Sequence, residues 1–114
     1  MPTFEPFAVV AARFPYVELE HGKRRPALVV SRPHLLETSG LLWVLMITSA
    51  RNEPWPDDIP IDDLVLAGLR KPSVIRPSKI ATIEASAAEP IGRLSAGTAA
   101  RVAAALRDML ATHP

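Results

Sequence analysis

Residues 24–31 read Arg24-Arg25-Pro26-Ala27-Leu28-Val29-Val30-Ser31, an apolar run that begins with two arginines and a proline. Residues 41–47, Leu41-Leu42-Trp43-Val44-Leu45-Met46-Ile47, form a second such run. Both runs are continuously apolar rather than alternating, which favours strands packed on both faces. We therefore expect residues 27–31 and 41–47 to form the centre of a β-sheet.

The proline decides how the second arginine is presented. Pro26 fixes its own φ and disfavours the helical region for Arg25, so this guanidinium projects from extended backbone at the edge of the core. A planar fork held in this way suits a phosphate or a carboxylate. The alternative interpretation is a solvated basic turn before a strand.

Further strands are expected on either side of this centre. Their predicted ranges are residues 7–14, residues 59–61, and residues 73–76 continued by 79–83. Pro77 interrupts the last of these, which indicates a bulge or bend at that point. Residues 15–25 and 52–58 are expected to be loops.

Two helices are expected in the second half of the chain. Asp63 can cap a single helical turn over residues 64–67, which Gly68 ends. Ser95 caps a longer amphipathic helix over about residues 96–111. Its apolar stripe consists of Ala99, Val102, Leu106, Met109 and Leu110. Short strands with one terminal helix predict a small, mainly β, partly open barrel.

Composition sets the class of protein. With 114 residues, of which 48% are hydrophobic, the chain suffices for one core, so a single domain over residues 1–114 is expected. Its 12 prolines favour short strands joined by stiff loops. The absence of cysteine excludes disulfides and thiolate metal sites and is typical of the cytoplasm. No apolar run is long enough to span a bilayer, and we expect a soluble protein that is not exported.

The net charge of +1 by itself argues against a nucleic-acid partner, but the distribution of charge is more informative than the sum. Acidic residues gather at 57–58 and 62–63, whereas many basic residues fall near strand ends. These basic residues are Lys23, Arg24, Arg25, Arg51, Arg70, Lys71, Arg76 and Lys79. The pattern indicates either a basic face opposite an acidic edge or an evenly mixed surface. The three histidines have no metal-binding spacing, so no metal and no cofactor are expected.

Four segments of the chain together resemble one family. Residues 20–31, Glu20-His21-Gly22-Lys23-Arg24-Arg25-Pro26-Ala27-Leu28-Val29-Val30-Ser31, resemble the Glu-Gln-x-x-x-Arg-Pro-x-x-Val-x-Ser segment of the MazF/PemK toxins. Residues 41–49 resemble that family's second apolar strand, which ends in Thr-Ser or Thr-Thr. Gly68-Leu69 followed by Ser73-Val74-Ile75-Arg76 resembles its Gly-Leu and Ser-Val-Val-Arg block. Residues 91–95 lead into a terminal helix as in those proteins.

The resemblance implies a fold and an activity. The expected fold is an SH3-like barrel of the CcdB/PemK type with a C-terminal helix, usually as a homodimer. The expected activity is metal-independent endoribonuclease cleavage of single-stranded RNA, in which the 2′-hydroxyl attacks and a cyclic phosphate forms. The expected partner is a cognate antitoxin whose acidic, disordered tail covers the RNA groove.

The resemblance also assigns roles to residues. Arg25 matches the family's arginine before proline and would stabilise the crowded phosphate, and Thr48 would donate its hydroxyl to a phosphate oxygen. Glu20 is the first candidate for the base that accepts the 2′-proton. His21 is the second, because an unperturbed imidazole titrates near pH 6.5. The alternatives are an ordinary strand threonine at position 48 and a loop histidine without a role at position 21.

The chain departs from the family at one position. In the PemK branch, a catalytic aspartate follows the arginine of the Val-Arg block by two residues, but here Arg76 is followed by Pro77-Ser78. A serine cannot act as that base, so Glu20 or His21 carries the proton, or the protein cuts slowly or not at all. The predicted RNA contacts are Lys23, Arg24, Ser49, Arg51, Arg76, Ser78 and Lys79.

Two other functions stay open from the sequence alone. One is a toxin like the CcdB proteins, which block DNA gyrase with the terminal helix and its last residues and do not need an Arg-Pro loop. The other is a non-catalytic SH3-like module that binds a peptide or its antitoxin. For Arg76 and Lys79, plain surface charge is the alternative to phosphate contacts.

Overall fold

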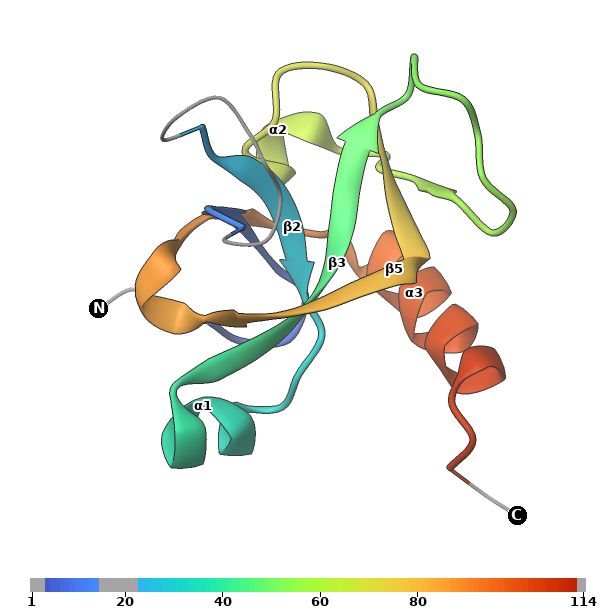
Figure 1. Cartoon of the computed structure of the whole chain (residues 1–114). Coiled ribbons are helices and arrows are strands. Elements are labelled where there is room, and N and C mark those ends of the chain that lie inside the picture. Colours follow the sequence, from blue (N-terminus) through green and yellow to red (C-terminus); the bar gives the residue numbers. More distant parts are fainter. Residues whose placement is uncertain (1–3, 15–22, 113–114) are drawn as a thin grey trace.

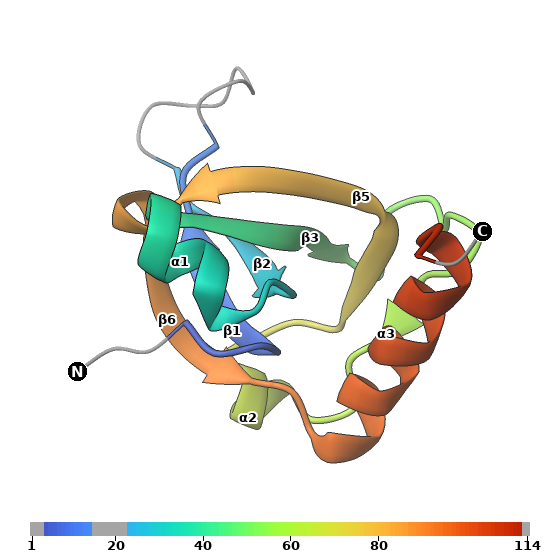
Figure 2. The same cartoon turned by 90° about the horizontal axis from the view of Figure 1, so that it is seen from below.

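A computed structural model of the chain describes residues 4–14 and 23–112 (Figure 1). Six strands in these residues pair antiparallel in one sheet, in the order β4-β5-β3-β2-β1-β6. Their bounds are β1 Ala8–Ala12, β2 Arg25–Val29, β3 Leu41–Ser49, β4 Ile59–Pro60, β5 Ser73–Glu84 and β6 Ala88–Arg93. Figure 2 shows the sheet curled into a partly open barrel with helix α3 (Ala96–Met109) alongside. The predicted mainly β barrel with a C-terminal helix is confirmed.

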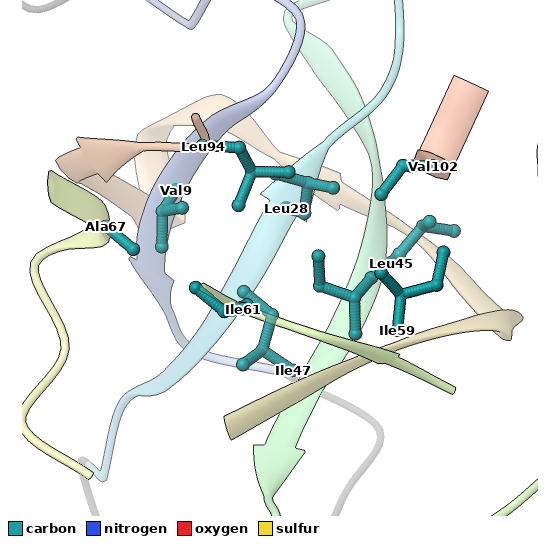
Figure 3. Packing of buried hydrophobic residues seen from close by; sticks show 10 residues of the cluster. Val9, Leu28, Leu45, Ile47, Ile59, Ile61, Ala67, Leu94 and Val102 are labelled. Carbon is teal, nitrogen blue, oxygen red and sulfur yellow. The ribbon is translucent and has the colours of Figure 1, made fainter. Parts of the chain in front are cut away.

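The two central strands are buried on both faces, as their continuous apolar runs predict. Leu28 and Leu45 belong to the core cluster that also contains Val102 of α3 (Figure 3). Val29 and Val44 belong to a second cluster on the opposite face of the sheet. Burying both faces contributes about 2 kcal/mol for each such side chain, so β2 and β3 hold the barrel together.

The first two strands differ from their predicted ranges. β1 is shorter than residues 7–14, because Phe7 has a φ of +70° and ends the extended backbone on that side. β2 begins at Arg25 rather than at residue 27. The reason is that residues 25 and 26 also pair with β1, where Ala12 lies opposite Arg25 and Ala11 lies opposite Pro26. Arg25 therefore projects from a strand and not from a loop.

The long strand β5 contains the predicted bulge. Leu45 pairs with Ile80, but the next residue, Met46, pairs with Arg76. Residues 77–79 are therefore left without partners on β3, and β5 bends sharply (Figure 2). The bend carries the first half of β5 to the short strand β4, which pairs with it through Ile59 and Pro60.

The capped turn at residues 64–67 is confirmed as helix α2 (Leu64–Ala67). The Asp63 carboxylate accepts a hydrogen bond from the Leu66 amide at 3.0 Å, and Gly68 ends the helix with a φ of +74°. Helix α1 (Pro33–Ser39), a 3₁₀ turn (Ala85–Ala87) and strand β6 were not predicted. None of the helices in the described ranges is long and apolar enough to cross a membrane.

Helix α3 ends two residues earlier than predicted. Val102 is buried, and Ala99 and Leu106 pack against the core. The predicted stripe is wrong for Met109 and Leu110, which are exposed. Leu110 borders a hollow with Trp43 and Ile80, and Met109 borders another with Ile59, so both side chains lie at the rim of the core rather than inside it. In Figure 1 the C-terminal end of α3 extends beyond the strands.

The start of α3 is fastened by a carboxylate. Ser95 accepts a hydrogen bond from the Thr98 amide at 3.2 Å and donates its hydroxyl to Asp62, 2.8 Å away. Thr98 also donates its hydroxyl to Asp62 at 2.8 Å. The bond from Ser95, followed by that from Thr98, holds the pKa of Asp62 below its ordinary value of 3.8. Asp62 thus caps the helix through two hydroxyl groups.

This lowered pKa predicts a pH-dependent contribution to stability. A carboxylate whose pKa is lower in the folded state stabilises that state fully above its unfolded pKa, and the contribution is lost as the pH falls through the folded pKa. We expect Asp62→Asn to lower the urea midpoint at pH 7 and to lower it much less near pH 2. Urea unfolding of both proteins at the two pH values checks this. An equal loss at both would show that Asp62 acts by shape alone.

Candidate active site

The register of the central strands brings Arg25 and Thr48 together. Ala27 lies opposite Met46, and continuing this antiparallel register by two residues places Arg25 opposite Thr48. Because side chains alternate along a strand, both residues lie on the same face as buried Ala27 and half-buried Met46. Arg25 and Thr48 therefore form a cross-strand pair where the core meets solvent.

This pair stands between two hollows in the surface. The first, of about 340 Å³, is completed by Pro26, Ile47, Ser49, Asn52, Leu69, Arg70, Lys71 and Ser73. The second, of about 400 Å³, is completed by Phe14, Met46, Ile47, Arg76, Lys79, Ile80 and Ala81. In Figure 1 the start of β2, the end of β3 and the segment between α2 and β5 lie at the same end of the barrel. An extended ligand could occupy both hollows with its middle over Arg25 and Thr48.

The turn after β3 orients the threonine. Asn52 Nδ2 donates a hydrogen bond to Thr48 Oγ1 at 2.5 Å. The turn itself is fixed because the Arg51 amide donates to Ser49 Oγ at 3.2 Å and the Ala50 amide donates to the Pro72 carbonyl at 2.9 Å. With one lone pair of Thr48 Oγ1 occupied by Asn52, its O–H remains to donate to a ligand. Sequence reasoning missed Asn52, whose only signal was a turn-forming residue four positions after a strand-end threonine.

Neighbouring arginines 24 and 25 have different surroundings. Arg24 Nη1 forms a salt bridge with Glu89 Oε2 of β6 at 2.6 Å. Among the described residues Arg25 has no ion-pair partner, and its side chain is exposed. The salt bridge directs the Arg24 guanidinium to β6, whereas the Arg25 fork is available at the hollows.

Arg76, which was predicted to contact an RNA phosphate, is buried. Its side chain is only 9% exposed, its Nε donates to Asp58 Oδ1 at 3.2 Å, and its Nη2 donates to the Glu53 carbonyl at 2.6 Å. The guanidinium is thus already neutralised by a carboxylate with which it is buried. Arg76 holds the loop before β4 through these bonds, and it also lines the second hollow.

The other predicted RNA contacts are spread around the hollows. Lys79 lines the second hollow, and Ser49 lines the first. Four exposed residues line neither: Lys23, Arg24, Arg51 and Ser78. Glu20 and His21 lie outside the described residues. Arg70 and Lys71 were not predicted as contacts, although they line the first hollow.

The acidic residues at 57–58 and 62–63 do not act together as one acidic edge. Asp58 neutralises Arg76, Asp63 caps α2, and Asp62 fastens α3. No group of three His, Cys, Asp or Glu side chains in residues 4–14 and 23–112 could hold a metal ion.

Comparisons with known proteins identify the family of the chain. The sequence matches the family described as "PemK-like, MazF-like toxin of type II toxin-antitoxin system" over residues 5–110. A comparison with curated protein sequences gives no match.

Solved structures match along nearly the whole chain. MazF from Deinococcus radiodurans matches with 25% identity and a TM-score of 0.71, covering 92% of this chain and 94% of that one. The MazE-MazF structure from the same organism matches with 23% identity and a TM-score of 0.73, covering 96% of both chains. A mycobacterial endoribonuclease in complex with its cognate antitoxin matches with 15% identity and a TM-score of 0.67, covering 91% and 89%.

Proposed function

Because the chain belongs to the PemK-like, MazF-like toxins of type II toxin–antitoxin systems, we propose that it is an endoribonuclease that cleaves single-stranded RNA without a metal ion. The observation that carries the proposal is that Arg25 and Thr48 both line the two neighbouring hollows, which also contain basic residues. A scissile phosphate over this pair would have one nucleotide neighbour in each hollow.

In this proposal the two side chains stabilise the phosphate as its charge increases. The Arg25 fork donates two parallel hydrogen bonds to non-bridging oxygens, and Thr48 donates a third through the hydroxyl that Asn52 orients. Because Pro26 and the pairing with β1 fix the Arg25 backbone, little ordering of the main chain is needed during the reaction.

The bond changes need no other reactant. The 2′-oxygen attacks the adjacent phosphorus, its proton passes to a base, and the bond from phosphorus to the 5′-oxygen breaks. The leaving oxygen takes up a proton, which gives a 2′,3′-cyclic phosphate and a 5′-hydroxyl. We assign the base to Glu20 or His21, which precede β2 in the sequence. Exposed Ser78, in the bulge of β5, cannot accept this proton.

The basic residues at the hollows are suited to the RNA backbone. Arg70 and Lys71 line the first hollow, and Lys79 lines the second, so phosphates on both sides of the cut have cationic partners. Lys23, Arg24, Arg51, Ser49 and Ser78 are proposed as outer contacts, with Arg24 shared with Glu89. Binding through such contacts falls as salt rises.

The proposed biological setting follows from the family. We propose that this toxin is a cytoplasmic homodimer, and that a cognate antitoxin with an acidic, disordered tail inhibits it. The cations that would hold RNA phosphates offer the same charge complementarity to such a tail. Inhibitor and substrate are therefore expected to compete for the hollows.

Cleavage of a long single-stranded RNA in excess EDTA, followed by mapping of the cut ends, tests the proposal. We expect cuts at a short sequence, with a cyclic phosphate on one fragment and a 5′-hydroxyl on the other. The Arg25→Ala protein, prepared in parallel, controls for contaminating nucleases. Intact RNA throughout would indicate a binding module, and activity that requires an added divalent ion would contradict the metal-independent reaction.

A further inference from the structure

The loop between β3 and β4 holds one large aromatic ring at the surface. The Trp55 amide donates a hydrogen bond to Asp58 Oδ2 at 2.9 Å, and the Asp58 amide donates back to the Trp55 carbonyl at 3.3 Å. Asp57, between them, has a φ of +71°, which closes the turn. Despite this fixed backbone, the Trp55 residue is 41% exposed.

A buried ion pair supports the ring. The Arg76 guanidinium carbon lies 4.4 Å from the centroid of the Trp55 ring, in cation–π geometry. The same guanidinium is held by Asp58 and by the Glu53 carbonyl. It is therefore a fixed surface against which the Trp55 ring packs. Because Trp55 is positioned before any ligand arrives, a ligand that stacks on it loses little binding free energy to ordering the protein.

Two residues beside the ring also line the candidate active site. Arg76 and Lys79 line the same hollow of about 400 Å³ as Arg25 and Thr48. Lys79 Nζ also lies 5.7 Å from the centroid of the Trp55 ring. A strand leaving the scissile phosphate through this hollow therefore reaches the ring.

The charges of the loop select which part of a nucleotide meets the ring. Glu53 and Asp57 are exposed on the same loop as Trp55, and their carboxylates repel phosphate. Lys79 offers a phosphate partner nearer the hollow. The uncharged, flat base is thus the part of the nucleotide that fits against Trp55, whereas the phosphate stays with the cations.

We propose that Trp55 is a stacking site for a nucleobase next to the scissile phosphate, with Arg76 and Asp58 as its positioning residues. This inference rests on the proposed function, because it takes RNA as the ligand of the hollow. Stacking of this kind is tolerant of base identity, so Trp55 contributes affinity and register at that nucleotide.

A double-mutant cycle tests the inference by combining a substitution of Trp55 with removal of a base from the RNA probe. The probe is an oligoribonucleotide that spans the mapped cut and carries a 2′-deoxy nucleotide there, so that affinity is measured without cleavage. If no cut is found, the tightest binder from a panel of oligoribonucleotides serves. Each neighbouring position is made abasic in turn. We expect Trp55→Leu to weaken binding of the intact probe by about 5- to 100-fold and Trp55→Phe to weaken it far less.

The base dependence separates stacking from a structural effect. For one probe of the abasic series, the wild-type and Trp55→Leu proteins should have equal affinities. The thermal unfolding midpoint of Trp55→Leu should differ little from that of the wild type. Trp43→Leu is the matched control, because Trp43 is 47% exposed but lines another hollow with Leu35 and Leu106. We expect it to bind the probe like wild type.

Several outcomes would overturn the inference. A Trp55→Leu protein that loses the same affinity for intact and every abasic probe shows that the ring only supports Arg76. A loss confined to antitoxin binding shows a protein contact instead. If the RNA is cleaved normally but the effect of Trp55→Leu does not depend on any base, this inference alone is contradicted. If no RNA binds, the proposed function is contradicted as well.

Discussion

Replacing Arg25 or Thr48 by alanine lowers the single-turnover rate constant of RNA cleavage by about 10²-fold or more, while RNA affinity changes much less. Each substitution removes a positioned donor that acts mainly as charge develops in the transition state, and the loss of one such donor typically has this size. Rates at saturating RNA, together with dissociation constants for an uncleavable analogue, separate the two effects.

Two controls make this result specific. Arg25→Lys keeps the positive charge but loses the fork, so we expect near wild-type RNA affinity and little recovery of the rate. Arg70 lines the first hollow. We expect Arg70→Ala to weaken RNA binding in a salt-dependent way and to leave the cleavage rate at saturating RNA nearly unchanged. An Arg25→Ala protein that cuts at the wild-type rate would refute the assignment.

Gly92→Ala and Gly68→Ala each destabilise the fold by about 2–4 kcal/mol, because the two glycines let α2 approach β6 closely. A Cβ on Gly92 would lie 2.5 Å from the Leu66 carbonyl oxygen, and a Cβ on Gly68 would collide with the Ile91 carbonyl. Gly68 also has a φ of +74°, which L side chains adopt at a cost. Urea unfolding at neutral pH measures both losses.

Gly97→Ala is the matched control for these substitutions. A Cβ on Gly97, in the first turn of α3, would meet no atom within 4 Å apart from its chain neighbours and the backbone of its own helix. We expect this variant to gain about 0.5 kcal/mol from the lower backbone entropy of the unfolded chain. If all three alanine variants were equally stable, the close approach of α2 and β6 would not be a source of stability.

The parts of the fold that follow local signals could be predicted from the sequence. The continuous apolar runs identify β2 and β3, Asp63 and Gly68 mark the ends of α2, and Pro77 marks the bulge of β5. Each of these features depends on the conformational preferences of a few adjacent residues.

The missed elements depend on contacts across the chain. α1 begins at Pro33 without a side-chain cap at Arg32, so its start carries a weak sequence signal. β6 contains Pro90 and Gly92, which are unfavourable within a strand, and it forms because β1 pairs with it at the edge of the sheet. The exposure of Met109 and Leu110 likewise depends on tertiary packing, which helical spacing alone does not show.

The candidate site shows the same division. The resemblance to MazF/PemK toxins pointed to Arg25 and Thr48 as candidates. That both line the same two hollows depends on how β2 and β3 are aligned, which the sequence of one strand does not contain. The burial of Arg76 could not be foreseen, because its partners Asp58 and Glu53 lie in a loop that only the bend of β5 brings near. Asn52 was missed for a similar reason, since its bond to Thr48 requires the turn after β3.

The central claim is that Arg25 and Thr48 act on a phosphodiester attacked by its own 2′-hydroxyl. The most direct measurement is the single-turnover rate of cleavage of an oligoribonucleotide that has one 2′-deoxy nucleotide at the mapped cut. We predict no cleavage at that position, unchanged affinity, and normal cleavage when the deoxy nucleotide is moved elsewhere in the RNA. Cleavage of the deoxy-substituted position at the unsubstituted rate would contradict the account, because the attacking oxygen would then come from water.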